Sequence, residues 1–333
     1  MTTMRELILE LPDQLRWAAE LDPPAIPEAN EILVSAMGGS AVGATVAAAV
    51  AEEAGHRIAV HRSYGLPGWA ASHRPLVLAV SHSGDTEETL DAVEVAGAAS
   101  LPIAAVTTGG RLADLAEAAG WPLVRVPPGP QPRAAMGYLT GAILRLAEAA
   151  GMVPRQGASL HEAADVVDRI LGGGDGPGFD LAADLAAALD GRVAVICGGD
   201  GVGAVAAGRW KTQINENGKA PAYSAVLPEL DHNEVVGWEA FPRLSQDRFG
   251  LVWLHDAGEH PRVTARARIT AELLDGRVGA AGDVYSVGAG VLARIFSLTV
   301  IGDLVSDAIA ARAGVDPMPV DVISDLKKRL ADE

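Results

Sequence analysis

The sequence predicts an α/β protein with two domains, each containing a mainly parallel sheet flanked by helices, and further helices at the ends of the chain. Three observations support this prediction. Short apolar runs alternate with longer helix-compatible runs, which is the pattern of repeated βαβ units. The chain has 333 residues, a length that favours two domains with separate cores. A glycine-rich strand–turn–helix pattern occurs in both halves, at 37–44 and at 197–204.

The first half is expected to begin with an amphipathic helix at 4–20, followed by a proline-rich connector at 23–27. Beyond the connector, apolar runs predict strands, and the longer stretches between them predict helices. The expected strands lie at 31–37, 57–63, 76–81, 101–107 and 122–127, and the expected helices at 42–54, 86–97, 112–119 and 134–150. We assign residues 1–152 to this first domain.

A glycine-rich stretch at 172–178 is the best candidate for a linker, because glycine and proline interrupt regular structure. We therefore place a linker region at 153–180 and a second domain at 181–333. The same alternation of strands and helices resumes there. The expected strands lie at 192–197, 221–226, 250–254 and 282–287, and the expected helices at 181–189, 202–216, 262–275, 292–313 and 319–331.

The composition is that of a globular, acidic protein. Hydrophobic residues make up 49% and charged residues 21%, which is typical of a folded rather than a disordered chain. The net charge of −17 argues against general binding to nucleic acids or anionic membranes, which need a basic surface. The single cysteine, Cys197, excludes an intrachain disulfide. The N-terminus has no signal-peptide pattern, and no apolar run reaches the roughly 20 residues of a membrane span, so we expect a cytoplasmic protein.

The segment Ser81-His82-Ser83-Gly84-Asp85-Thr86 is the most informative stretch of the chain. It follows an apolar run and leads into a helix, so hydroxyls and free backbone N–H groups gather at a helix N-terminus, an arrangement that binds phosphate. Gly38-Gly39-Ser40 stands in the same position after an earlier strand. Parallel strands bring such loops to one edge of a sheet, so we expect a phosphate site there. The alternative is that these residues only form tight turns and helix caps.

The two copies of the glycine-rich pattern differ in a way that bears on phosphate binding. Ser40 in the first copy corresponds to Asp200 in the second, and a carboxylate at that position would repel phosphate. The second half also lacks a counterpart of the hydroxyl-rich loop, because its third strand ends in an acidic run at 254–259. We therefore expect only the first half to bind phosphate.

Other polar residues are candidates for acid–base or electrostatic roles. Glu216 ends the helix expected at 202–216, where a carboxylate is unfavourable with the helix dipole. His232 lies in a polar run, and histidine is the side chain best suited to acid–base work at physiological pH. Arg133 precedes the helix expected at 134–150, where the dipole disfavours a cation. From the residues alone, each also fits an ordinary role as a solvated helix end, a locally bonded loop histidine or a surface arginine.

Two groups of residues resemble known families. Gly38-Gly39-Ser40 with Ser81-x-Ser83-Gly84-x-Thr86-x-x-Thr89 resembles the signature of the sugar isomerase (SIS) domain. A second group resembles the bifunctional phosphoglucose/phosphomannose isomerases of archaea and bacteria: Asn215-Glu216-Asn217, Leu227-Pro228-Glu229-Leu230-Asp231-His232-Asn233-Glu234 and Gly237-Trp238. The resemblance covers most of the chain, from about residue 30 to the C-terminus. It implies two flavodoxin-like SIS domains, each an αβα sandwich, and an aldose–ketose isomerase.

The resemblance also implies a role for each candidate residue. Glu216 corresponds to the base that moves a proton between neighbouring carbons through an enediolate, and Arg133 to a stabiliser of the enediolate oxygen. His232 would assist ring opening from the partner subunit of a homodimer. Lys327, or Lys328 beside it, corresponds to a lysine of the last helix that also serves ring opening; from the residues alone, this run is a charged helix face. The expected phosphate-binding residues are Gly39, Ser40, Ser81, Ser83 and Thr86.

The expected substrate is a small sugar phosphate, glucose 6-phosphate and by the same resemblance mannose 6-phosphate, converted to fructose 6-phosphate in glycolysis or gluconeogenesis. Met318 stands where the family often has threonine, so the preference between the two C2 epimers stays open. We expect no cofactor and no metal, because His255 and His260 lack the spacing of helical zinc ligands and Asp200 would oppose a dinucleotide. The alternatives are a sugar-phosphate sensor without catalysis, or another SIS enzyme such as an arabinose 5-phosphate isomerase or an amidotransferase isomerase half.

Overall fold

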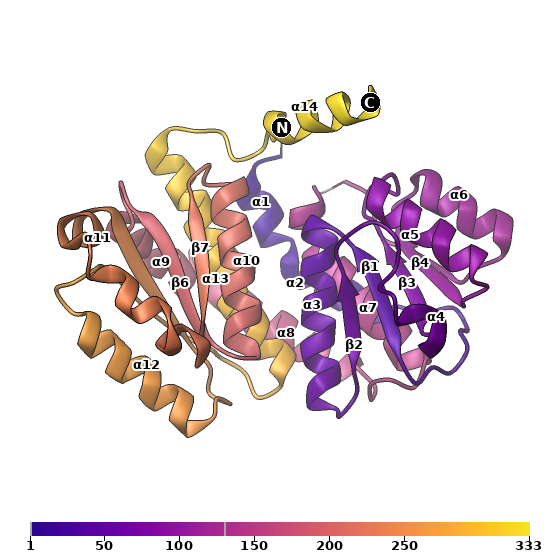
Figure 1. Ribbon diagram of the computed structural model, residues 1–333, viewed down its shortest axis with the longest axis horizontal. Helices are drawn as coiled ribbons and strands as arrows, with labels where there is room; N and C mark the ends of the chain where they lie inside the picture. Colours follow the sequence, from indigo (N-terminus) through magenta and orange to yellow (C-terminus); the bar gives the residue numbers. More distant parts are fainter. Residues whose placement is uncertain (1, 130) are drawn as a thin grey trace. The chain divides into compact units, whose positions relative to one another are not determined.

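The structure is a computed structural model that describes residues 2–129 and 131–333. Contacts between residues divide the chain into two compact units (Figure 1). The first unit contains Leu9–Ile170 and Val287–Ser297. The second unit contains Leu171–Ser286 and Leu298–Glu333, together with the start of the chain through Ile8.

The first unit is built on a parallel sheet with the strand order β2-β1-β3-β4-β5. Strands β1, β3 and β4 are buried along their whole lengths, which explains their nearly unbroken apolar sequences. The strands are β1 Ile32–Ala36, β2 Ile58–His61, β3 Leu76–Val80, β4 Ile103–Thr107 and β5 Leu123–Arg125. The helices are α2 Leu11–Glu20, α3 Gly38–Glu53, α4 Ala70–His73, α5 Glu87–Ala98, α6 Gly110–Ala119, η1 Pro132–Ala134, α7 Met136–Ala149 and α8 Gly157–Leu171, which ends at the boundary of the unit.

The second unit contains a parallel sheet with the order β7-β6-β8-β9, which matches β2-β1-β3-β4 of the first sheet. The two units therefore share one topology, as the repeat predicts. The strands are β6 Val193–Gly199, β7 Ala222–Leu227, β8 Phe249–His255 and β9 Gly279–Tyr285. The helices are α1 Met4–Leu9, η2 Gly172–Gly174, α9 Pro177–Ala188, α10 Val202–Glu216, η3 Glu229–His232, η4 Glu234–Trp238, α11 Pro242–Arg248, α12 Pro261–Leu274, α13 Val291–Ala313, which begins in the first unit, and α14 Asp321–Ala331.

Small residues allow the helices to pack closely. A side chain at Gly141 of α7 would collide with Ala18 of α2. In the second unit, the buried indole of Trp210 on α10 packs against Gly302 of α13 and donates to the carbonyl of Leu298 at 2.8 Å. No helix within the described ranges combines the length and the apolar character needed to cross a membrane.

The α/β fold with parallel sheets is confirmed, and the expected strands and helices are found close to their expected positions. The expected helix at 4–20 is divided into α1 and α2, with Pro12 in the first turn of α2, where proline is tolerated. Much of the region expected to be a linker is helix α8. Its buried residues Leu160, Ala164 and Val167 follow the helical period, so burial of this face stabilises the helix.

Candidate active site

The two loops expected to bind phosphate lie at the switch point of the first sheet. Strands β1 and β3 are neighbours at its centre, and the chain leaves them toward opposite edges, to β2 and to β4. The last residues of the two strands, Ala36 and Val80, are in register. Open α/β sheets bind ligands in the crevice that this divergence leaves at the carboxyl ends of the strands. The sheet order thus places Gly38-Gly39-Ser40 beside the 81–86 loop.

Hydrogen bonds join the two loops. The backbone N–H of His82 donates to Ser40 Oγ at 3.3 Å. Within the second loop, Ser81 Oγ lies 2.8 Å from Thr86 Oγ1 and accepts the N–H of Gly84 at 3.0 Å. Two of the hydroxyls expected to bind phosphate are therefore paired with each other, and the third, Ser40, is joined to the same loop through the backbone of His82. No basic side chain belongs to this group, so recognition of an anion here would depend on neutral donors and helix N-termini.

The remaining hydroxyl of the loop is more accessible. Ser83 is exposed, and its Oγ accepts the N–H of Asp85 at 3.3 Å. The tight turn depends on Gly84, whose φ of +80° is left-handed and whose missing side chain leaves room for the carbonyl of Gly109. The loop therefore presents Ser83 at the surface while the rest of its backbone is fixed against the neighbouring turn.

The side chain of His82 is buried beside this loop. Burial lowers the pKa of the imidazole, and its Nε2 atom has no hydrogen-bond partner among the described residues. The residue is linked to the neighbouring loops through its backbone: the N–H donates to Ser40 Oγ, and the carbonyl accepts from Thr108 Oγ1 at 2.8 Å.

Arg133 lies against the glycine turn of the same unit. A Cβ at Gly39 would fall 2.8 Å from the carbonyl oxygen of Pro132 and 3.0 Å from the backbone nitrogen of Arg133, so only glycine allows this approach. Arg133 is buried, and its Nη1 donates to Gln131 Oε1. In the sequence, Arg133 follows the run Pro130-Gln131-Pro132, and Pro130 lies outside the described residues. We call the two hydroxyl-lined loops, 38–40 and 81–86, the cradle. The cradle and Arg133 thus lie within one unit.

Gln14 fixes the backbone around Arg133, a role that the sequence did not predict. This side chain is completely buried on α2. Its Nε2 donates to the carbonyl of Ala134 at 2.7 Å, and its Oε1 accepts the N–H of Gly137 at 3.1 Å. One amide thus connects η1 to the first turn of α7, where orphan N–H groups need acceptors.

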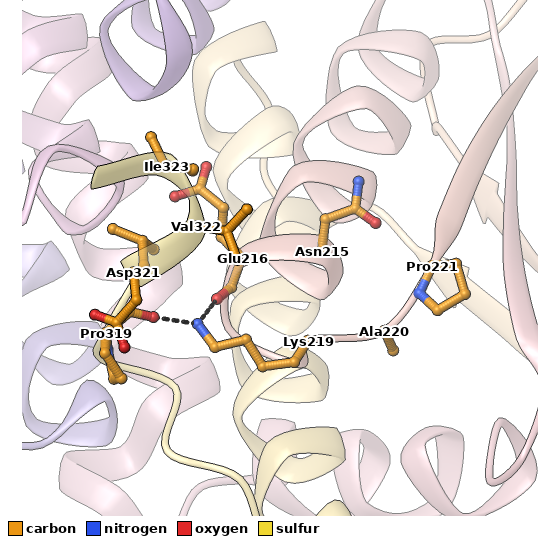
Figure 2. Close-up of a pocket in the computed structure, with 10 residues that line it drawn as sticks. Asn215, Glu216, Lys219, Ala220, Pro221, Pro319, Asp321, Val322 and Ile323 are labelled. Carbon is orange, nitrogen blue, oxygen red and sulfur yellow. Dashed lines mark hydrogen bonds between the residues drawn. The ribbon is translucent and has the colours of Figure 1, made fainter. Parts of the chain in front are cut away.

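Glu216 is the last residue of α10 and faces a cavity in the second unit. The cavity has a volume of about 560 Å³ and is lined by the end of α10, the turn that follows it and the start of α14. Glu216 is half-buried, and its side chain points toward the first turn of α14 (Figure 2). The lining residues are Asn215, Glu216, Lys219, Ala220, Pro221, Pro319, Val320, Asp321, Val322 and Ile323.

A buried polar seam between α10 and α13 holds the end of α10 in place. Arg209 donates to both carboxylate oxygens of Asp303 at 3.1 Å, a bidentate pair with little exposure to solvent. Asn217, next to Glu216, is fully buried and donates through Nδ2 to Ser306 Oγ at 3.0 Å. A buried polar group that loses its hydrogen-bond partner destabilises the folded protein. These paired groups therefore fix the register of the helix that carries Glu216.

His232 lies at the end of η3, which follows β7. The residue is exposed and does not line the cavity that Glu216 faces. The preceding residue is well anchored: Asp231 accepts hydrogen bonds from Arg266 Nη1 at 2.8 Å and from Thr270 Oγ1 at 2.7 Å, both on α12. The backbone at His232 is thus fixed while its side chain stays accessible.

Lys327 and Lys328 are exposed residues of α14. Neither lines the cavity, although the first residues of the same helix do. The structure thus brings Glu216 to the beginning of the helix that carries both lysines, and places the lysines themselves further along it.

The second sheet lacks the hydroxyl-lined loops at the equivalent edge. Gly199, the last residue of β6, corresponds to Gly39 in the repeat, but the space over Gly199 is taken by the carboxylate of Glu259 from the loop after β8. Burial raises the pKa of Glu259. The position in the second sheet that corresponds to the cradle is therefore acidic, with Glu259 over Gly199 and Asp200 in place of Ser40.

A duplicated α/β fold with hydroxyl-lined loops at one of its two switch points is the arrangement expected of a protein with two SIS domains. Residues 180–330 match the family described as "Bacterial phospho-glucose isomerase C-terminal SIS domain". The fold is similar to that of hypothetical protein TT0462 from Thermus thermophilus, with a TM-score of 0.74, 18% identity and coverage of 98% of this chain and 91% of that one.

Curated relatives narrow this class to one family. A bifunctional phosphoglucose/phosphomannose isomerase from Caldicellulosiruptor bescii is 37% identical over 99% of each chain. An enzyme of the same name from Aquifex aeolicus is 32% identical over 81% of this chain and 80% of its own. The chain belongs to the bifunctional phosphoglucose/phosphomannose isomerase family.

Proposed function

We propose that this protein is an aldose–ketose isomerase that interconverts glucose 6-phosphate, and mannose 6-phosphate, with fructose 6-phosphate. The observation that carries the proposal is Glu216, a half-buried carboxylate that faces a cavity at the end of α10 in a chain of this family. The names of the relatives support both substrates. We place the reaction in cytoplasmic carbohydrate metabolism.

In the proposed reaction, Glu216 removes the proton from C2 of the open-chain aldose and returns it to C1 of the enediolate, while the hydroxyl proton moves from O2 to O1. Arg133 stabilises the negative charge that develops on the enediolate oxygen. His232 of one subunit and Lys327, or Lys328, assist ring opening, which makes the homodimer the active form. The proton is transferred without a metal ion, because a single carboxylate can serve both carbons.

The cradle formed by Gly39, Ser40, Ser81, Ser83 and Thr86 holds the substrate phosphate. The connected hydroxyls and the buried Ser40 and Ser81 support this role. The proposal divides the work between domains: residues 1–152 bind phosphate and supply Arg133, and residues 181–333 supply the acid–base groups.

One assay tests the proposal directly. The purified protein is given each hexose 6-phosphate in turn, and formation of fructose 6-phosphate is followed. Turnover of either substrate supports an isomerase, and the ratio of the two kcat/KM values gives the epimer preference. Binding of both sugar phosphates without turnover would contradict the proposal in favour of a sensor.

The role of the cradle in phosphate binding can be tested by replacing Ser40 with aspartate, the residue at the equivalent position of the second half. Ser40→Asp is expected to raise KM by about 10²–10³, because two unit charges about 4 Å apart repel by roughly 4 kcal/mol at an effective dielectric constant of about 20. Ser40→Ala serves as the control for the lost hydroxyl and should raise KM far less. Equal KM values for the two variants would place the phosphate elsewhere.

A further inference from the structure

The turn after α10 contains a backbone conformation that points to a function. Lys219 has a φ of +52°, in the left-handed region that residues other than glycine rarely occupy. Gly218, immediately before it, is not the residue that adopts this conformation, and a Cβ there would lie 2.7 Å from the carbonyl oxygen of Ile214. The glycine at position 218 is thus explained by its close packing, whereas the left-handed lysine that follows it calls for an examination of its side-chain contacts.

The side chain of Lys219 bridges two segments that are distant in sequence. Its Nζ donates to the carbonyl of Glu216 at 2.6 Å and to the carbonyl of Pro319 at 2.5 Å (Figure 2). The carbonyl of Pro317 lies 3.5 Å from the same nitrogen. The first of these carbonyls belongs to the last turn of α10, where the helix leaves acceptors unpaired and the dipole favours a cation.

The segment before α14 is suited to being held in this way. Pro317 and Pro319 have no backbone N–H, and the N–H of Met318 donates to Asp316 Oδ1 at 2.9 Å. The segment therefore offers carbonyl oxygens, and an ammonium group with three donors can bind several of them at once. Lys219 supplies this group from the end of the helix that carries Glu216.

We propose that Lys219 is a positioning residue for the isomerase reaction: its ammonium group holds the start of α14 against the end of α10 and so forms the cavity that Glu216 faces. This inference rests on the proposed function of Glu216. Lys219 acts through the placement of Glu216 and of residues 319–323, which line the same cavity.

Two variants separate the ammonium group from the backbone conformation. Lys219→Met removes the charge. Lys219→Asn also removes it, and asparagine tolerates the left-handed region, so this variant protects the test against misfolding of the turn. Both are expected to lower kcat by about tenfold with little change in KM for the hexose phosphate, because the phosphate cradle lies in the other unit. Lys219→Arg should recover much of kcat, and Lys211→Met, on α10 before this turn, is the control for loss of a lysine charge.

Hydrogen exchange provides a second measurement that does not depend on turnover. In both charge-removing variants, the amides of 321–331 should exchange faster than in the wild type, while the strands of the second sheet keep their protection. Unchanged kcat and unchanged exchange would overturn the inference. A loss of kcat without faster exchange would also overturn it, because Lys219 would then act on the substrate itself. A wild-type protein without isomerase activity would refute the proposed function, whereas the exchange comparison would still test the contact with the segment before α14.

Discussion

Replacing Glu216 with glutamine is expected to lower kcat for both hexose 6-phosphates by about 10⁴, at the upper end of what a positioned acid–base group contributes. Glutamine keeps the length and shape of the side chain and is an equally good helix former, so α10 should be unaffected. It cannot accept the C2 proton. KM should stay close to the wild-type value, because the interaction is lost mainly in the transition state.

The measurement combines initial rates with the reaction in D₂O. A carboxylate that carries the substrate proton can exchange it with solvent, so the wild type should introduce deuterium into the recovered sugar phosphate, and Glu216→Gln should not. Glu272→Gln is the control, because Glu272 is an exposed carboxylate of the same unit that pairs with Arg268 on α12. Wild-type-like turnover in Glu216→Gln would assign the base to another residue.

Most of the fold could be predicted because buried parallel strands leave a strong local pattern. Strands β3 and β8 are buried through nearly their whole lengths and stand out from the helices around them. Helix α8 was not predicted because the glycine-rich stretch that follows it indicated a linker. Gly172 and Gly173 have left-handed φ values that suit a helix end, and the helix before them depends on tertiary burial of residues such as Leu160.

The candidate site likewise combines features with a local sequence pattern and features that depend on tertiary contacts. The hydroxyl-rich loop is a continuous segment whose chemistry is visible in its own residues, and only its partner Ser40 depends on the sheet order. Gln14 and Lys219 could not be predicted in this way. Gln14 binds Ala134, 120 residues away, and Lys219 binds Pro319, 100 residues away. Such roles are set by tertiary contacts between segments with no motif in common.

His232→Asn is expected to lower kcat/KM for glucose 6-phosphate by about 10²–10³, because asparagine can donate a hydrogen bond but cannot transfer a proton during ring opening. A substrate that is already open should be affected much less. Erythrose 4-phosphate is such an aldose, because its phosphate blocks the hydroxyl that would close the ring. The two substrates are compared in both proteins. Equal losses for the cyclic and the open substrate would assign His232 to proton transfer or folding and not to ring opening.

Mixing two inactive variants tests whether His232 acts across the subunit interface. In a heterodimer of Glu216→Gln and His232→Asn, one site would combine both substitutions and the other would keep both native residues, if the two come from different subunits. Random assortment of equal amounts makes half of the dimers mixed, so roughly a quarter of the wild-type activity should return. The exposed position of His232, away from the lining of the Glu216 cavity, favours this outcome. If both residues serve a site within one chain, no mixture can contain an intact site, and activity will stay at the level of the separate variants.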